Sequence, residues 1–281
     1  MKKILIFGAG GQLGRELASI YPNAVRVFHH GSSNDLTVDL ARKGMAESVI
    51  IKESPDLVIN AAALANVDLC EKDHQLAFDV NGEAVLSMVK GCRSVGSAFV
   101  HVSTDYVFDG IVGNYSENSI PNPINYYGLS KLIGDAYALA YEDAIVVRTS
   151  GVFGHLKNYP LYVLETLRNG KLVNAISGYY SPIHARNLAL SISELVKTDF
   201  KGLINIAGER VSRYELAMKI ANTFSLDSSL ISEVSDLKSL NAKRPFDSSL
   251  DSRLAHVIIP LDFSSVESNL SAMKATLAKG N

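Results

Sequence analysis

Short runs of apolar residues, many of them β-branched, recur along the first half of the chain, and segments with the spacing of amphipathic helices separate them. The runs are Lys3–Phe7, Ala24–Phe28, Leu57–Asn60, Ala98–Ser103 and Ala144–Arg148. Continuous apolar runs of this length are typical of strands buried on both faces, as in a parallel sheet between two layers of helices. The alternation of strands and helices predicts an α/β fold with a doubly wound parallel sheet.

The pattern changes after about Ser150. Two segments there have helical spacing, Tyr159–Leu172 and Ala185–Lys197, while Ser177–His184 resembles a loop and Gly202–Ala207 a core strand. The region Ser225–Asp251 is polar and has no strong periodicity. We expect residues 1–150 to form the main domain and residues 151–281 to form mainly a smaller C-terminal lobe that binds substrate, with the chain returning to the main sheet near residues 185–208.

Composition and charge narrow the class of protein. The chain has 281 residues, of which 47% are hydrophobic, and a formal net charge of -2. This is enough apolar material for a well-filled core, and the interspersed charges give no basic stripe for nucleic acid or for a membrane surface. The first apolar run is too short for a secretory signal, and no run approaches the ~18–20 apolar residues of a membrane span. The only two cysteines, Cys70 and Cys92, lack the spacing of metal ligands or of a disulfide framework. We therefore expect a soluble, cytoplasmic protein without a metal site.

A glycine-rich segment follows the first predicted strand directly and precedes a predicted helix, Arg15–Tyr21. Gly8 suits the tight turn, Gly11 lets the backbone approach a pyrophosphate, and Gly14 lets the helix pack closely on the strand. The helix N-terminus then offers N–H groups and a positive dipole end to the phosphates. A glycine pattern alone also fits a flexible turn, but its place between a strand and a helix favours a Rossmann-type dinucleotide site.

The end of the second predicted strand bears on which nicotinamide cofactor is used. An acidic residue there would hold the 2′-hydroxyl of NAD. This chain instead continues from Phe28 with His29–Ser33, a segment of two histidines, a glycine and two serines. Because no acid in this segment repels a 2′-phosphate, we expect NADPH rather than NADH, although no arginine is present to bind it. The two histidines also fit an exposed loop.

The segment Tyr127–Lys131 places a phenol and an ammonium group four residues apart on a predicted helix, and therefore on one face of it. A nearby ammonium favours the phenolate, so we expect the pKa of Tyr127 to fall below its usual value of ~10. Such a tyrosine can pass a proton to a carbonyl oxygen. Lys131 can also reach the ribose of a nicotinamide nucleotide. Taken alone, the pair also fits two unrelated surface residues.

Two strand ends supply further candidates. The fourth run ends at Ser103, so Thr104 lies at the carboxyl edge of the predicted sheet, where open α/β sheets bind ligands. Thr104 can donate a hydrogen bond to the same carbonyl oxygen as Tyr127, although Thr104 and Asp105 also fit a simple turn. At the end of the third run, the small side chains of Ala61, Ala62 and Ala63 would let a cofactor lie against the backbone.

Together these motifs resemble the dTDP-4-dehydrorhamnose reductases, which belong to the extended short-chain dehydrogenases. The resemblance covers nearly the whole chain, and its most specific element is Ser103–Gly110. The other motifs that carry it are Gly8–Gly14, Asn60–Ala63, Val67–Glu71, Tyr127–Lys131, Arg148–Ser150, Ser181–Pro182, Arg244–Pro245 and Ser249–Asp251.

The resemblance implies roles for individual residues. Thr104, Tyr127 and Lys131 would be the catalytic residues, and Asp105 and Tyr106 would approach the sugar. The cofactor would be lined by Gly11, Gln12, Leu13, His30, Asp39, Leu40 and Ala63. The chain departs from the family pattern at two places. Leu64-Ala65 stands where many family members have an aromatic residue or His followed by Thr, and Gly151 stands where an aromatic residue that packs on the sugar is usual, so these positions bear on which sugar is bound.

Three polar residues outside these motifs have two interpretations each. Asp68 and Glu71 could form an acid pair, but their position just after Asn66 favours the first turn of a helix, where acids complement the helix dipole. Asn81 could join a proton relay or be an ordinary polar helix residue.

Three functions remain open from the sequence. The first is NAD(P)H-dependent reduction of the 4-keto group of a nucleotide sugar, with dTDP-4-dehydro-L-rhamnose as the favoured substrate. Such an enzyme could form a homodimer. The second is a nucleotide-sugar epimerase or 4,6-dehydratase, although Tyr106 stands where a dehydratase usually has Glu. The third is a non-catalytic subunit of the same fold, such as the β subunit of methionine adenosyltransferase.

Overall fold

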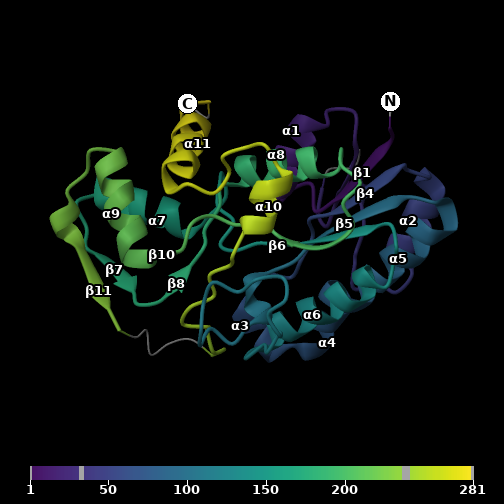
Figure 1. Cartoon of the computed structure of the whole chain (residues 1–281), viewed down its shortest axis with the longest axis horizontal. Coiled ribbons are helices and arrows are strands. Elements are labelled where there is room, and N and C mark those ends of the chain that lie inside the picture. The colour runs from purple at the N-terminus through teal and green to yellow at the C-terminus, as the bar shows by residue number, and fades with distance from the viewer. Residues whose placement is uncertain (1, 32–34, 236–240, 280–281) are drawn as a thin grey trace.

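A seven-stranded parallel sheet forms the centre of the molecule in the computed structural model, which describes residues 2–31, 35–235 and 241–279 (Figure 1). The strand order is β3-β2-β1-β4-β5-β6-β9. These strands are β1 (Ile4–Phe7), β2 (Val25–Phe28), β3 (Leu36–Thr37), β4 (Leu57–Asn60), β5 (Ala98–Val102), β6 (Ala144–Arg148) and β9 (Gly202–Asn205). The order reverses between β1 and β4, and open α/β sheets bind ligands at the carboxyl ends of the strands beside such a reversal. The predicted doubly wound fold is confirmed.

Helices cover both faces of this sheet (Figure 1). Those of the larger part are α1 (Gln12–Ile20), α2 (Met45–Glu53), α3 (Val67–Lys72), α4 (His74–Phe78), η1 (Asp79–Glu83), α5 (Ala84–Val95), η2 (Asp105–Val107), α6 (Tyr126–Leu139), α8 (Ala185–Leu195) and α10 (Arg253–Ile258). The helices α1 and α8 lie on one face, and α2, α5 and α6 lie on the other (Figure 1).

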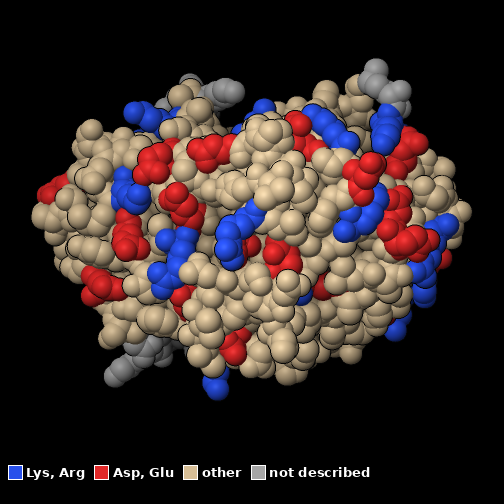
Figure 2. Space-filling view, viewed as in Figure 1, with Lys and Arg blue, Asp and Glu red and all other residues tan. Residues whose placement is uncertain are grey.

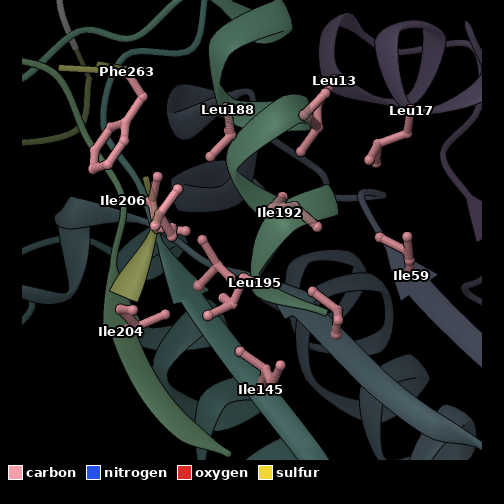
Figure 3. Close-up of a cluster of buried hydrophobic side chains, with 14 of the residues drawn as sticks. Leu13, Leu17, Ile59, Ile145, Leu188, Ile192, Leu195, Ile204, Ile206 and Phe263 are labelled. Atoms are coloured by element: carbon pink, nitrogen blue, oxygen red, sulfur yellow. The ribbon is translucent and has the colours of Figure 1, made fainter. Parts of the chain in front are cut away.

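The core between the sheet and the α1–α8 layer shows why these helices dock where they do (Figure 3). Leu13 and Leu17 are spaced by one helical turn on α1, and both side chains are buried. The equivalent stripe on α8 includes Leu188 and Ile192, which are fully buried against the strands. Burial of one such side chain stabilises a fold by about 1.5–3 kcal/mol, so the two apolar stripes hold both helices on the sheet.

A second core lies in the smaller part of the molecule, at the left of Figure 1. Its elements are α7 (Tyr159–Arg168), β7 (Val173–Ile176), β8 (Tyr179–Tyr180), β10 (Val211–Ser212), α9 (Arg213–Thr223), η3 (Ser228–Leu230), β11 (Ile231–Val234) and α11 (Val266–Lys279). The strands form two small sheets, β7 with β11 and β8 with β10. Helix α9 begins with a capping box, in which Ser212 and Glu215 satisfy each other's backbone amides.

Several element bounds differ from the predicted ones. Helix α1 begins at Gln12 rather than Arg15, because Gly14 lies within its first turn and not in the preceding loop. Helix α7 ends at Arg168 rather than Leu172, and the side chain of Asn169 donates to the carbonyl of Glu165 there. The strands β8 and β11 lie in regions that we predicted to be irregular. Both are short strands that form by pairing, β8 with β10 and β11 with β7. Pairing between distant segments is not visible in the local periodicity of the sequence.

Acidic and basic side chains alternate over the face shown in Figure 2, as the interspersed charges of the sequence predicted. No helix among the described residues is long and apolar enough to span a bilayer.

Candidate active site

The glycine segment forms a tight turn at the carboxyl end of β1. Gly8 has a φ of 77°, and a Cβ at Gly14 would lie 2.0 Å from the carbonyl oxygen of Gly8. The backbone therefore closes on itself in a way that a side chain would prevent. Gly11 is the N-cap of α1 and brings no capping side chain, so the first amides of the helix stay available to an anion. This cradle fits a dinucleotide pyrophosphate.

The side chains of the two residues after Gly11 do not point into that cradle. The amide group of Gln12 makes two hydrogen bonds of 2.9 Å with the backbone N–H and carbonyl of Leu156, in the loop before α7. Leu13 is 6% exposed and packs in the core (Figure 3). Both residues would therefore meet a phosphate through their backbone amides.

The other predicted cofactor residues lie along the same sheet edge. Ala61 and Ala62 are half-buried beside Gly8, and Ala63 is exposed after them. His30 and Asp39 are exposed, with Asp39 next to Arg42 at 3.6 Å, and Leu40 is half-buried. Ser32 and Ser33 lie outside the described residues. The sequence analysis overlooked Asp35, whose carboxylate lies so close to Gly31 that a Cβ there would be 2.8 Å from it.

The three predicted catalytic residues converge from two elements. Thr104 follows β5 as the N-cap of η2, where its Oγ1 accepts a hydrogen bond of 3.3 Å from the amide of Tyr106. Tyr127 and Lys131 lie in the first turns of α6, whose N-cap, Asn125, accepts from the amide of Gly128 at 2.9 Å. The Tyr127 ring meets the Tyr106 ring edge-on, with 5.7 Å between centroids.

The predicted fall in the pKa of Tyr127 is wrong for this structure. Burial raises the pKa of the phenol above its ordinary value, and the nearby Thr104 hydroxyl only partly opposes this, while the carboxylate of Asp105 adds to the rise. Lys131 does not counteract it because its amine faces away. The Nζ atom donates to the carbonyl of Val102 at 2.8 Å and lies 3.3 Å from Nε2 of His101. A phenol that stays protonated is still suited to donate a proton.

Lys131 itself is 1% exposed. Burial lowers the pKa of its amine to about 8, although the carboxylate of Asp135 favours the charged form. Asp135 lies one turn further along α6 and accepts a hydrogen bond of 3.0 Å from Nε of Arg148. A buried lysine, carboxylate and guanidinium thus lie beneath Tyr127.

Asp105 is held by hydroxyl groups from three parts of the chain. Thr104 donates to it at 3.1 Å, Ser150 at 2.7 Å and Ser248 at 2.5 Å. Burial raises the pKa of this carboxyl, and the three hydroxyls oppose that rise. The residue therefore ties the ends of β5 and β6 to the segment that leads into α10.

A cavity of about 750 Å³ opens next to these residues, between the sheet edge and the smaller part of the molecule. Asp105 and Tyr106 lie on its wall. The opposite walls carry aromatic and cationic side chains, namely Phe153, Tyr159, Tyr179, Tyr180, Phe246, Arg213, Lys243 and Arg244. This composition suits a ligand with a ring at one end and negative charge in its middle.

Gly151 lines the same cavity. A Cβ at this position would lie 2.7 Å from the ring of Tyr180, so that ring occupies the space in which a side chain of residue 151 would stand. The aromatic surface that the resemblance led us to expect at residue 151 is thus supplied by Tyr180 of β8.

The remaining polar candidates have structural partners. Asn66 caps α3 through a hydrogen bond of 3.0 Å to the amide of Leu69, which confirms that Asp68 lies in a first helical turn. Asp68 also binds Arg244 at 2.9 Å, and Glu71 accepts from the amide of Tyr126 at 2.9 Å. Asn81 bonds to both backbone groups of Leu64 and to the hydroxyl of Ser130, which fits a bracing role.

Sequence reasoning missed His101, Asp135 and Arg213. His101 was visible as the one imidazole inside an apolar strand, and Asp135 as the residue one turn after Lys131. Arg213 gave no local signal.

Comparison with known proteins identifies the family of the chain. A family model described as the RmlD substrate binding domain matches residues 1–278. A dTDP-4-dehydrorhamnose reductase of Aggregatibacter actinomycetemcomitans is 33% identical over 231 residues, 78% of each protein. The chain belongs to the dTDP-4-dehydrorhamnose reductase family. The resemblance seen in the sequence is therefore confirmed.

Solved structures extend the comparison. A hypothetical dTDP-4-dehydrorhamnose reductase from Sulfolobus tokodaii superposes with a TM-score of 0.89 at 47% identity, over 93% of this chain and 96% of that one. A reductase from Bacillus anthracis in complex with NADP has a TM-score of 0.87 at 25% identity, covering 98% of both chains. The methionine adenosyltransferase 2 subunit beta of Bos taurus is 28% identical over 89% of this chain and 80% of that protein.

Proposed function

We propose that this protein is an NADPH-dependent reductase of the 4-keto group of dTDP-4-dehydro-L-rhamnose. The observation that carries the proposal is the contact of Tyr127 with Thr104 and Tyr106. The Thr104 hydroxyl is close enough to the phenol to lower its pKa, the Tyr106 ring meets the Tyr127 ring edge-on at 5.7 Å between centroids, and Tyr106 lines the cavity. A substrate carbonyl brought to the two hydroxyls would meet a proton donor and a second hydrogen-bond donor together.

Each residue then has one task. A bound nicotinamide cofactor would supply the hydride. The glycine cradle would hold its pyrophosphate, and Ala61, Ala62 and Ala63 would lie against it. Tyr127 donates its proton to the sugar oxygen. Thr104, whose single hydroxyl proton is donated to Asp105 in this structure, would turn that proton to the same oxygen as negative charge grows there. Lys131, whose amine turns toward Val102 and His101 in this structure, would redirect its ammonium toward Tyr127 to support the phenolate that the tyrosine becomes. Asp105 and Tyr106 orient the sugar.

We infer that the rest of the substrate lies along the cavity. Arg213 supports this, because its guanidinium lies over the ring of Tyr180 at 4.9 Å and over that of Tyr159 at 5.8 Å. A positive charge at this position would suit a diphosphate, and the neighbouring rings would suit the base. The smaller C-terminal lobe is therefore proposed as the substrate-binding part. The oligomeric state and the cellular location stay predictions from the sequence.

The alternative of a dehydratase is less well supported. Elimination of water needs an acid that can protonate the leaving hydroxyl. Asp105 is the one acid among the described residues that line the cavity, and its carboxylate already accepts from three hydroxyls. Only a measurement of activity can distinguish the reductase from a non-catalytic subunit of the same fold, since Thr104, Tyr127 and Lys131 are all present.

A panel of 4-keto nucleotide sugars tests the proposal. Cofactor absorbance at a fixed enzyme concentration is expected to fall with dTDP-4-dehydro-L-rhamnose and to fall less with sugars on other nucleotides. Oxidation of NADPH with none of the panel would favour the non-catalytic alternative.

Gly14→Ala is expected to damage the cofactor site. Its Cβ would lie 2.0 Å from the oxygen of Gly8, and overpacking of this kind costs about 1–3 kcal/mol. If this cost falls on the cofactor-binding conformation of the turn, NADPH should bind about 5- to 150-fold more weakly by fluorescence titration. Gly10→Ala is the matched control, because its Cβ meets only the ring of Phe28 at 3.4 Å. Equal affinity of the two variants would contradict a pyrophosphate site in this turn.

NADPH is expected to bind more tightly than NADH, and Asp35 is the residue that limits this preference. Its carboxylate next to Gly31 would repel a 2′-phosphate and accept from a 2′-hydroxyl. Titration of both cofactors against the wild type and Asp35→Asn measures the effect. The variant should gain affinity for NADPH and not for NADH, whereas tighter NADH binding by the wild type would contradict the prediction.

A further inference from the structure

A chain of buried polar side chains runs beneath the active site from the end of β4 to α6. Asn60, His101 and Lys131 are each no more than 1% exposed. They come from three different elements and meet in the order Asn60, His101, Lys131. Buried polar groups of this kind cost free energy unless their hydrogen bonds are satisfied, so the direction of each bond is informative.

A backbone contact fixes which atoms donate and which accept in this chain of hydrogen bonds. The amide N–H of Ala62 donates to Oδ1 of Asn60 at 3.0 Å, which fixes which end of the Asn60 amide is the oxygen. The Nδ2 group of Asn60, which can only donate, therefore faces Nδ1 of His101 at 3.1 Å. Nδ1 must accept that hydrogen bond. A ring whose Nδ1 is an acceptor is neutral and carries its proton on Nε2.

The amine of Lys131 lies nearer to this Nε2 atom, at 3.3 Å, than Oδ1 of Asp135, at 3.8 Å. Nε2 of His101 lies 3.3 Å from Nζ of Lys131, while Nζ donates to the carbonyl of Val102 at 2.8 Å. An uncharged amine can accept from the ring N–H and donate to the carbonyl at once. An ammonium has no lone pair with which to accept, so the ring N–H opposes it.

Other charged groups act on the same amine. Asp135 lies 3.8 Å from Nε2 of His101 and is paired with Arg148 from β6 at 3.0 Å. Its carboxylate favours the ammonium form, and burial favours the amine. Tyr127, one turn earlier on α6, is held protonated by burial. The amine is thus balanced between its two forms, and the ring N–H contributes to that balance.

We propose that Asn60 and His101 are positioning residues for Lys131, which act by presenting a ring N–H rather than a ring lone pair to its amine. The chain starts at Ala62, in the wall predicted to face the cofactor, and so connects that wall to Lys131. The inference rests on the proposed function only for the role of Lys131 in turnover. Burial holds the pKa of His101 well below its ordinary value, and the positive charge of Lys131 in its ammonium form lowers it further, in line with a neutral ring.

The tautomer of His101 tests the proposal without any substrate. In a ¹⁵N–¹H spectrum of the full-length protein, the ring signal that disappears in His101→Gln belongs to His101. We expect this ring to carry its proton on Nε2 and to stay neutral from pH 6 to pH 9. This range brackets the Lys131 pKa of about 8. In Asn60→Asp the carboxylate would require a donor, so the proton should appear on Nδ1. A wild-type ring protonated on Nδ1 would overturn the proposal.

The pH dependence of kcat/KM is the second arm. In Asn60→Asp and in His101→Phe, the Nε2–H of residue 101 no longer faces the Lys131 amine. The ammonium form of Lys131 is then less opposed, so the pKa that governs the alkaline limb should rise by about one pH unit. His101→Gln can still present an N–H at the position of Nε2 and should keep the wild-type limb. An unchanged limb in Asn60→Asp would overturn the positioning role, even if His101→Phe does not fold. A wild type with the expected tautomer but no turnover would instead count against the proposed function.

Discussion

Tyr127→Phe is expected to lower kcat by at least ~100-fold, the usual scale of general acid catalysis, while affinity for NADPH stays nearly unchanged. The phenyl ring keeps the edge-on packing against Tyr106 and loses only the hydroxyl. Steady-state kinetics with dTDP-4-dehydro-L-rhamnose and a separate cofactor titration measure the two quantities.

The neighbouring tyrosine is the matched control for this variant. Tyr126 stands on the same helix but stacks on His74, with 3.9 Å between centroids. Tyr126→Phe should therefore retain wild-type kcat. A Tyr127→Phe enzyme as active as Tyr126→Phe would end the assignment of the proton donor.

Lys131→Met is expected to reduce kcat/KM by ~100-fold or more and also to weaken NADPH binding, because one cation serves both the phenolate and the cofactor. Methionine fills the buried channel of the lysine stem without a charge. Lys90→Met, on the exposed side of α5, is the control for loss of a lysine on a helix and should keep wild-type kinetics. A Lys131→Met enzyme that loses turnover but keeps NADPH affinity would remove the cofactor role.

The same lysine sets the expected pH dependence of the wild type. Burial lowers the pKa of Lys131 to about 8, so its ammonium form is lost as pH rises through that value. Because the raised pKa of Tyr127 keeps the phenol protonated there, the alkaline fall in kcat/KM should follow Lys131. A kcat/KM that stays constant up to pH 10, which lies above the Lys131 pKa of about 8, would contradict this assignment.

The parts of the site that the sequence predicts are those built from residues close together along the chain. The turn at Gly8 and the close packing at Gly14 depend on one strand and the helix after it, so the pattern alone identifies them. The same holds for Tyr127 and Lys131 on one helix face. The parallel, doubly wound sheet is likewise predicted by the alternation of strands and helices, whereas its strand order comes from the structure.

The parts that it does not predict depend on residues distant in the sequence. Asp105 is held by Ser150 and Ser248, which are 45 and 143 positions away. The expected fall in the pKa of Tyr127 failed for the same reason. The spacing gave the distance to Lys131 but not the direction of its amine, which turns toward His101 on β5. Tyr180 fills the space beside Gly151 only because β8 folds back over it.

The fate of the transferred hydrogen tests the central claim most directly. The protein is incubated with NADPH deuterated at the transferable position and with dTDP-4-dehydro-L-rhamnose, and the products are examined by mass spectrometry and NMR. A reductase releases one oxidised cofactor for each sugar reduced and leaves one deuterium at C4 of the sugar. Conversion of the sugar with no net oxidation of the cofactor would contradict the account, because an epimerase or a dehydratase returns the hydride that it borrows.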